Sequence, residues 1–238
     1  MSGHSKWSTI KHKKALIDAK RGKAFSRLSA LISIIAKHGN DPTMNPNLRL
    51  YIEKAKQVGM TKENIERAIK RGTGEFDGAS LEEVTYEAYA PGGVGIIIEA
   101  ITDNKNRAIA EIKSVLNKFG GKLAEHGSVN YQFKKQGVIN VKKGKISNDE
   151  ISLTAIDAGA KDIDESDDSI VIYTEPSNFE AIKKAIEELG VTIESAEISL
   201  EPKQTIAVEE SKKESVIKLL EALDDLDDVT NISANADI

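Results

Sequence analysis

The spacing of apolar residues along this 238-residue chain is helical up to about residue 75 and first becomes strand-like after it. Before that point apolar side chains recur every three or four residues, as on one face of an α-helix. The first predicted helix would bury Phe25, Leu28, Leu31, Ile32, Ile34 and Ile35 and end at Gly39. A short amphipathic helix cannot bury its apolar face alone, so we expect it to pack against neighbouring helices.

Two further helices are predicted before residue 75. Asn45 provides a capping side chain ahead of Pro46, which suits the first helical position, and this helix would end at Gly59. Thr61 caps the next helix, which is expected to stop at Arg71-Gly72. Gly72-Thr73-Gly74 is then interpreted as a linker.

From Leu81 onward apolar and polar residues alternate, which is typical of half-buried β-strands. A hairpin is predicted around Pro91-Gly92-Gly93. Thr102-Asp103-Asn104 then caps a helix that runs to Phe119, and a strand is predicted over 129–133. Residues 137–202 have the order strand, helix, strand, strand, helix, strand, which is the ferredoxin-like arrangement. The final strand-helix-strand stretch, 205–234, is too short to fold alone, so it should complete the sheet begun at residue 81.

The sequence therefore predicts a multidomain α+β protein. Its N-terminal domain, residues 1–75, combines a basic arm with a three-helix bundle. An α+β domain comprises residues 80–134 and 203–238. A ferredoxin-like domain, residues 135–202, is inserted between these two segments.

Charge is divided unevenly between the two ends of the chain. Residues 1–71 contain 16 Lys and Arg against five acids, a net of +11, whereas the remainder has a net charge of −16. A cationic end on an otherwise acidic chain favours a partner that carries phosphate groups.

The basic arm supplies the main candidate site. Lys6, Lys13, Lys20 and Arg27 are seven residues apart, so on a helix they form one stripe roughly 30 Å long. Trp7 and His12 offer rings that can stack on a base or a ribose. The predicted nucleic-acid contacts are Lys6, Trp7, Lys11, His12, Lys13, Lys14, Lys20, Arg21, Lys23 and Arg27. The alternative is a solvated basic tail without a dedicated partner.

Two smaller basic groups are possible accessory phosphate contacts. Arg67, Lys70 and Arg71 close the third predicted helix, where cations also complement the negative end of a helix dipole. Lys105 and Arg107 lie at the start of a predicted helix, where free N–H groups bind anions and where an ordinary cap is the alternative.

Several kinds of chemistry have no support in the sequence. The chain has no cysteine, and its four histidines do not have metal-ligand spacing. The acidic stretches 162–168 and 224–228 are interpreted as solvated loops. No phosphate-binding glycine motif and no nucleophile elbow is present. We therefore predict no catalytic residue, no metal site and no cofactor.

The start of the chain lacks the apolar core of a signal peptide, and the longest apolar runs are too short to span a bilayer. We expect a cytoplasmic protein that has no membrane partner and is a monomer.

Segments along the whole chain resemble the signature segments of the YebC family. They are Gly3-His4-Ser5-Lys6-Trp7, Ile10-Lys11-His12-Lys13-Lys14-Ala15, Asp18-Ala19-Lys20-Arg21-Gly22-Lys23, Asn64-Ile65-Glu66-Arg67-Ala68-Ile69-Lys70-Arg71-Gly72, Tyr89-Ala90-Pro91-Gly92-Gly93-Val94, Thr102-Asp103-Asn104-Lys105-Asn106-Arg107 and Asp227-Asp228-Val229. His38-Gly39-Asn40 and Ser29-Ala30 depart from the residues usual in the family. The departures leave the arm unchanged and weaken the expectation of further phosphate contacts on the first helix.

This resemblance implies the same three domains and a non-enzymatic role in gene expression. Two roles are described for the family: a DNA-binding transcriptional regulator, and a ribosome-associated translational activator, as in the mitochondrial relatives, that assists difficult peptide-bond formation. The resemblance also implies that the arm residues from Lys6 to Lys23 named above contact nucleic acid.

Charge and resemblance together predict a nucleic-acid-binding regulator of gene expression that is not an enzyme. Its partner would be DNA or, alternatively, rRNA or tRNA on the ribosome. A second alternative is an interaction or small-molecule-binding module in which the arm is only a tail.

Overall fold

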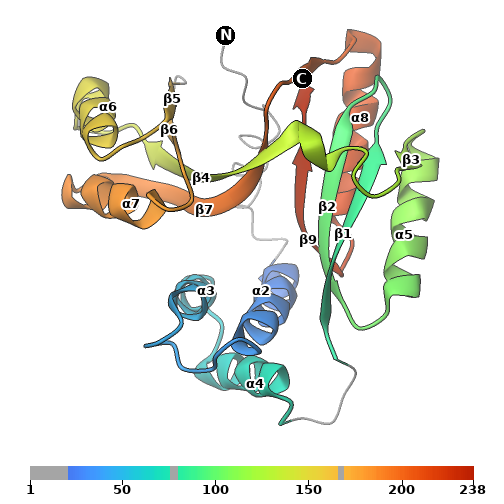
Figure 1. Ribbon diagram of the computed structural model, residues 1–238, viewed down its shortest axis with the longest axis horizontal. Helices are drawn as coiled ribbons and strands as arrows, with labels where there is room; N and C mark the ends of the chain where they lie inside the picture. Colours follow the sequence, from blue (N-terminus) through green and yellow to red (C-terminus); the bar gives the residue numbers. More distant parts are fainter. Residues whose placement is uncertain (1–20, 76–79, 166–168) are drawn as a thin grey trace.

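In the computed structural model, three bodies surround the middle of the molecule (Figure 1). The structure describes residues 21–75, 80–165 and 169–238. A helical bundle occupies the N-terminal part, an α+β unit carries the C-terminus, and a second sheet with two helices lies between them in sequence (Figure 1).

The bundle consists of α2 (Arg21–Ala36), α3 (Pro46–Gln57) and α4 (Lys62–Thr73). The predicted caps are confirmed: the side chain of Asn45 accepts a hydrogen bond from Leu48 N, and that of Thr61 accepts one from Asn64 N. The helices enclose an apolar core built from Phe25, Leu28, Ile32, Ile35, Leu48, Tyr51, Ile52, Ala55, Met60, Ile65, Ala68 and Ile69. The predicted bundle is therefore present.

The third helix runs further than the sequence indicated. It continues through Gly72 to Thr73, and Gly74, with φ of 80°, forms its left-handed C-cap. A Cβ on Gly72 would overlap the backbone carbonyl of Ser33 in α2 and lie 3.0 Å from Cβ of Ala36. The linker interpretation of Gly72 is thus wrong, because this glycine lets α4 approach α2 closely.

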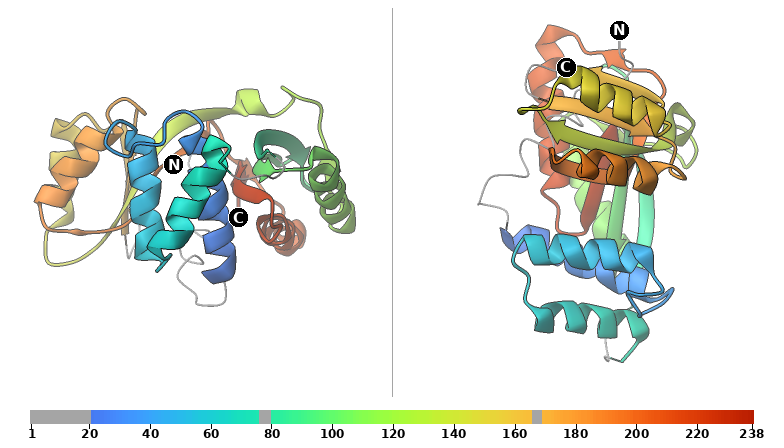
Figure 2. Two further views of the ribbon diagram at one scale, coloured as in Figure 1. Left: turned by 90° about the horizontal axis from the view of Figure 1, so that it is seen from below. Right: turned by 90° about the vertical axis from the view of Figure 1, so that its left-hand side faces the viewer.

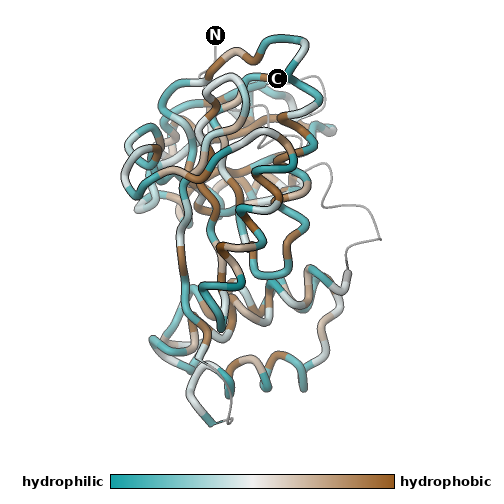
Figure 3. Tube along the Cα trace, turned by 90° about the vertical axis from the view of Figure 1, so that its right-hand side faces the viewer, coloured by the Kyte–Doolittle hydropathy of each residue, from teal (hydrophilic) through white to brown (hydrophobic). Residues whose placement is uncertain are grey.

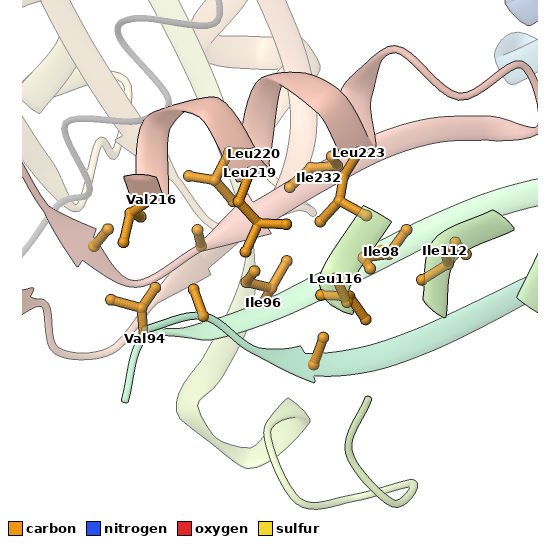
Figure 4. Close-up of a cluster of buried hydrophobic side chains, with 14 of the residues drawn as sticks. Val94, Ile96, Ile98, Ile112, Leu116, Val216, Leu219, Leu220, Leu223 and Ile232 are labelled. Carbon is orange, nitrogen blue, oxygen red and sulfur yellow. The ribbon is translucent and has the colours of Figure 1, made fainter. Parts of the chain in front are cut away.

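A four-stranded sheet with the strand order β3-β1-β2-β9 forms the α+β unit. Its strands are β1 (Glu82–Tyr89), β2 (Gly95–Thr102), β3 (Lys122–Leu123) and β9 (Val229–Ala234), and its helices are α5 (Lys105–Lys118) and α8 (Glu210–Asp224). Figure 4 shows how Leu219, Leu220 and Leu223 of α8 meet Ile96 and Ile98 of β2. The C-terminal segment completes the sheet begun near residue 81, as predicted, because β9 pairs with β2.

Two predicted strands differ from the structure. The stretch expected at 205–208 is β8 (Ile206–Ala207), and it pairs in parallel with β10 (Ala236–Asp237) in a separate two-stranded sheet. The strand expected over 129–133 is instead a short 3-10 helix, η2 (Asn130–Gln132), that leads into β4 (Phe133–Lys142). Backbone N–H groups at 127, 129 and 130 are bound by a carboxylate here, so they do not join a ladder.

The inserted unit has the predicted ferredoxin-like order. After β4 come α6 (Asn148–Asp157), β5 (Asp162–Glu165), β6 (Ser169–Thr174), α7 (Phe179–Glu188) and β7 (Thr192–Pro202). The sheet order is β5-β6-β4-β7 and every pairing is antiparallel. The multidomain α+β fold is confirmed, whereas the limits 1–75, 80–134 with 203–238, and 135–202 remain predictions about which stretches fold together.

The bundle and the insertion both make contact with the α+β unit. Ile34 on α2 packs with Leu81 and Ile101 beside the end of β2, which explains why the apolar face of α2 is wide. β4 and β7 extend from the ferredoxin-like sheet to the α+β unit, where Phe133 packs with Ile97 (Figure 2). Figure 3 shows that apolar residues are concentrated along the central strands. No helix in the described parts of the chain is long and apolar enough to cross a bilayer.

Candidate nucleic-acid interface

Most of the predicted arm contacts lie outside the described residues. These are Lys6, Trp7, Lys11, His12, Lys13, Lys14 and Lys20. Arg21 begins α2. Nucleic-acid contact by this segment therefore stays a prediction, and the described part of the site begins at Lys23.

Lys23 and Arg27 hold the start of α2 against the C-terminal end of α8. Nζ of Lys23 lies 3.5 Å from Oδ1 of Asp225, and a guanidinium nitrogen of Arg27 lies 3.0 Å from Oδ1 of Asp224. The same guanidinium donates to the backbone carbonyl of Asp224. The cationic side chains are only 16% and 19% exposed. A phosphate could bind either cation only by displacing a carboxylate of the same chain.

Burial also affects the charge of Lys23. Removal from water is the main reason why the pKa of Lys23 lies below its usual value, and repulsion from Arg27 adds to it. Asp225 and Asp224 act in the opposite direction. The interpretation of 224–228 as a solvated loop is wrong for Asp224, which ends α8 and binds Arg27, and for Asp228, which binds Arg107. Asp225 pairs with Lys23 but remains 57% exposed.

A second cationic group is available to a ligand. Arg67, Lys70 and Arg71 are exposed on α4, and none of the described side chains forms a salt bridge with them. Their spacing of three and four residues puts them on one side of the helix, away from the buried Ile65 and Ala68. Figure 1 shows α4 at the lower edge of the molecule, on the side of the bundle turned away from the ferredoxin-like unit. We call Arg67, Lys70 and Arg71 the α4 cations.

The sequence reasoning missed two exposed cations on the same bundle. Arg49 and Lys56 are on α3, seven residues apart and therefore on one side of that helix. They are also without salt bridges among the described residues. The signal available in the sequence was this spacing of seven residues along one side of the apolar face of α3.

Lys105 and Arg107 at the start of α5 are occupied by acids of the chain itself. Nζ of Lys105 lies 2.6 Å from a carboxylate oxygen of Glu82. Arg107 donates to both carboxylate oxygens of Asp228, at 2.9 and 3.1 Å, and pairs with Asp103 at 3.0 Å. Hydrogen bonding by Asp228 raises the pKa of the Arg107 guanidinium. The place where a phosphate was considered is thus filled by an internal carboxylate.

This contact joins two segments that are distant in sequence. Thr102 Oγ1 donates to the carboxylate of Asp228 at 2.8 Å, and Asn104 caps α5 by accepting from Arg107 N. The segments that resembled family signatures at 102–107 and 227–229 therefore meet at the end of the α+β sheet. Their position indicates a structural role.

Glu87 is a buried carboxylate that the sequence reasoning did not single out. It is 2% exposed and accepts hydrogen bonds from the backbone N–H groups of Gly127, Val129 and Asn130, at 2.6, 2.5 and 2.9 Å. Burial alone would raise its pKa, but these donors outweigh that effect, and the pKa of Glu87 lies below its usual value. The carboxylate fixes the loop before η2. Its only visible signal was an acid between Tyr86 and Ala88, in the part of β1 where the residues become buried.

Metal-ligating residues are not assembled in the described regions. No group of three or more His, Asp or Glu side chains there is arranged to hold an ion. Asp162 and Asp164 of the other acidic stretch lie on β5, at the edge of the ferredoxin-like sheet.

Two family models match the sequence of this chain. Residues 5–75 match the model described as the TACO1/YebC protein N-terminal domain, and residues 81–236 match the model described as the TACO1/YebC second and third domain. The chain belongs to the TACO1/YebC family. The resemblance seen in the sequence is thereby confirmed.

Individual relatives align with this chain over nearly their whole length. A protein of Halothermothrix orenii is 48% identical and one of Dictyoglomus thermophilum is 50% identical, each over 100% of this chain and 96% of the relative. Both are named probable transcriptional regulatory proteins. A crystal structure of a conserved hypothetical protein from Aquifex aeolicus has a TM-score of 0.89 and 45% identity, covering 98% of this chain and 97% of that one. Relatives named in this way support a regulatory role in the family.

Proposed function

We propose that this protein is a non-enzymatic, nucleic-acid-binding regulator of gene expression in the cytoplasm. The observation that carries the proposal is the group of α4 cations, which are exposed and have no salt-bridge partner among the described residues. They belong to the bundle that continues from the arm, within a stretch of net charge +11. The names of the relatives support regulation as the biological role.

The arm supplies most of the affinity in this proposal, and the α4 cations add contacts. Lys13, Lys14, Lys20 and Arg21 bring four positive charges within nine residues, directly before and at the start of α2. Contacts from Lys and Arg to phosphates fix a protein on a nucleic acid without reading its sequence. Affinity from such contacts falls steeply with salt, because binding releases counterions.

Two nucleic acids fit this description. Duplex DNA is the ligand expected from the names of the relatives. Structured RNA, such as rRNA or tRNA on the ribosome, is the second candidate, and it is favoured by the net charge of −16 beyond residue 71. A narrow basic end can enter an RNA groove while the acidic bodies remain away from the polyanion.

Neutralising the arm tests the proposal. Changing Lys13, Lys14, Lys20 and Arg21 to Gln should abolish binding to duplex DNA and to ribosomal particles in low salt. For any binding that remains on DNA, the slope of log affinity against log salt should fall by about 0.9 for each lost phosphate contact. The matched control changes Lys113, Lys145, Lys184 and Lys203 to Gln, since these lysines are exposed and lie on the other two bodies. Equal binding by the two quadruple variants would refute the proposal.

Crosslinking in cells distinguishes the two ligands. Sequencing of the nucleic acid attached to the protein would identify promoter DNA in the first case and rRNA or tRNA in the second. Deletion of residues 1–20 should remove either signal while the fold persists, because α2 and the contact of Lys23 with Asp225 are kept. Cellular function retained after this deletion would instead favour the small-molecule or interaction module.

A further inference from the structure

The ferredoxin-like sheet has one face that neither of its helices covers. α6 and α7 pack on Ile139, Val141, Ile170 and Ile172, so the residues that alternate with these point to the opposite face. Figure 2 shows α6 and α7 on the outer side of the sheet, and the opposite face is turned toward the middle of the molecule. We call this face the acidic sheet face; it contains Asp162, Asp164, Val171, Tyr173, Gln136, Val138, Asn140, Ser195, Glu197, Ser199 and Glu201, together with two lysines of β4, Lys134 opposite Glu201 and Lys142 at the end of the strand.

The strand register brings the acids of this face together. Tyr173 pairs with Asp162 on one side and with Val138 on the other, and Val138 pairs in turn with Glu197. Burial, and then the negative charges of Glu201, Asp164 and Asp162, raises the pKa of the Tyr173 hydroxyl. The carboxylates of three acids, two on β5 and one on β7, are therefore close enough to affect the same hydroxyl, that of Tyr173.

The acidic character continues onto the neighbouring bodies. Burial, followed by the charges of Glu197, Glu99 and Glu83, raises the pKa of Tyr51 on α3 to about 12. Lys54 of α3 lies 3.9 Å from Glu197. A ligand on this side of the sheet would thus meet negative charge from Glu83 of β1 and Glu99 of β2, whereas the charge of Glu197 is shared with Lys54.

Buried polar atoms on the same face lack hydrogen-bond partners. Gln136 and Asn140 are only 3% and 5% exposed. No described group donates to Oε1 of Gln136 or to Oδ1 of Asn140. Buried carbonyl oxygens are nearly always hydrogen-bonded, and leaving one without a donor costs about 1–3 kcal/mol. Ordered water or a segment that lies over the face would supply the donors for these two oxygens.

The N-terminal segment of the same chain has the required chemistry. Residues 1–20 contain five lysines, each with three donors and no acceptor, against the single acid Asp18. The segment joins α2 at Arg21, on the helix whose first turns are bound to Asp224 and Asp225. Twenty extended residues span up to about 66 Å, so the chain length allows the segment to reach the sheet.

We propose that residues 1–20 dock on the acidic sheet face of their own chain when no nucleic acid is bound. Lysine ammonium groups bind Asp162, Asp164 and Glu201, and donors of the segment satisfy Gln136 and Asn140. A nucleic acid cannot occupy this face, because its phosphates would be repelled by the acids. The docked segment and the nucleic acid therefore compete for the same lysines, a consequence that rests on the function proposed above.

Trp7 reports on docking, because it is the single tryptophan of the chain and lies within the segment. In the full-length protein at low salt, docking should shield Trp7 from acrylamide and shift its emission to shorter wavelength than in a synthetic peptide of residues 1–23. Changing Asp162, Asp164 and Glu201 to Asn, Asn and Gln should raise the quenching constant to the value of the peptide. Sodium chloride at high concentration should have the same effect on the wild-type protein, because ionic screening weakens exposed ion pairs.

A matched variant controls for charge. Asp149, Asp157 and Glu180 are exposed on α6 and α7, on the other side of the same sheet, and changing them to Asn, Asn and Gln removes the same charge. Trp7 should stay shielded in this variant, and circular dichroism should confirm that both triple variants are folded. Equal quenching of Trp7 in the two triple variants, or in the wild-type protein and the peptide, would overturn the proposal.

Nucleic-acid affinity separates docking from the proposed function. If about one molecule in ten is undocked, the variant of the acidic sheet face should bind about tenfold more tightly than the charge-matched control. Shielding of Trp7 without any nucleic-acid binding would support docking and refute the function. Arm-dependent binding by a protein whose Trp7 is as accessible as in the peptide would support the function and refute docking.

Discussion

The cations of α2 and those of α4 belong to one small bundle but have different surroundings. Lys23 and Arg27 lie against Asp225 and Asp224, and their side chains are largely buried. The α4 cations are exposed and form no salt bridge with a described residue. Basic residues in one stretch of sequence thus separate into a group that joins two bodies and a group that remains available to a ligand. Net charge alone does not distinguish them.

Gly72 offers the most severe test of this comparison, because the helices that carry the two groups meet there. Gly72→Ala should destabilise the protein by about 3 kcal/mol, since the added methyl group overlaps the Ser33 carbonyl. Urea unfolding measures this. The control is Gly22→Ala, where no atom lies within 4 Å of the new Cβ and helix propensity should add up to about 1 kcal/mol of stability. Similar loss of stability in both variants would show that α4 does not pack as described.

Arg27→Met should cost about 2 kcal/mol of unfolding free energy, less than for a fully buried ion pair because both side chains keep some contact with water. The change removes the partner of Asp224 on α2. Arg67→Met is the matched control and should change stability by less than about 0.5 kcal/mol. Should the two substitutions destabilise the protein equally, the division between joining and available cations fails.

Glu87 extends the comparison to a buried carboxylate that is bound by backbone N–H groups and not, like Asp224, by a cationic side chain. Its folded-state pKa is depressed, so its contribution to stability is present above its unfolded pKa, about 4.3, and is lost as pH falls through the folded value. Glu87→Gln should cost about 1–2 kcal/mol at neutral pH. Urea unfolding between pH 7 and pH 3 should show that the difference between wild-type and variant shrinks in acid. A constant difference over this range would contradict the assignment.

The smallest expected effect on folding comes from the α4 cations. Changing Arg67, Lys70 and Arg71 to Gln together should alter the unfolding free energy by less than about 0.5 kcal/mol. The same variant should lower the salt slope of DNA binding by about 0.9 for each phosphate contact that it removes. Arg49 and Lys56, changed in the same way, test whether α3 extends the interface. A salt slope identical to that of the wild-type protein would remove α4 from the site.

The elements of this fold were largely predictable where the signals are local. Side chains such as Asn45, Thr61 and Asn104 cap their helices as their positions indicated. The ferredoxin-like order followed from alternating apolar patterns, because each strand has one face on the helices. The membership of β9 in the first sheet followed from the size of the C-terminal segment.

Features that depend on distant partners were not predictable. Gly72 resembles a linker in sequence, and only the proximity of Ser33 shows that it is a packing residue. The pairing of Arg107 with Asp228 spans 121 positions, so local reasoning left a phosphate contact and a cap as alternatives. The loop bound by Glu87 followed an alternating pattern, but its N–H groups are engaged by a carboxylate on another strand.

The ladder shared by β4 and β7 affects how the insertion moves. Ten residues of β4, Phe133 to Lys142, pair with β7, so the inserted unit enters and leaves through two strands that are hydrogen-bonded to each other. A free rotation about this connection would break ladder hydrogen bonds, whereas twisting of the ribbon preserves them. The inserted unit should therefore rotate as one body when the β4-β7 ribbon twists. Its orientation relative to the α+β sheet would change gradually with that twist.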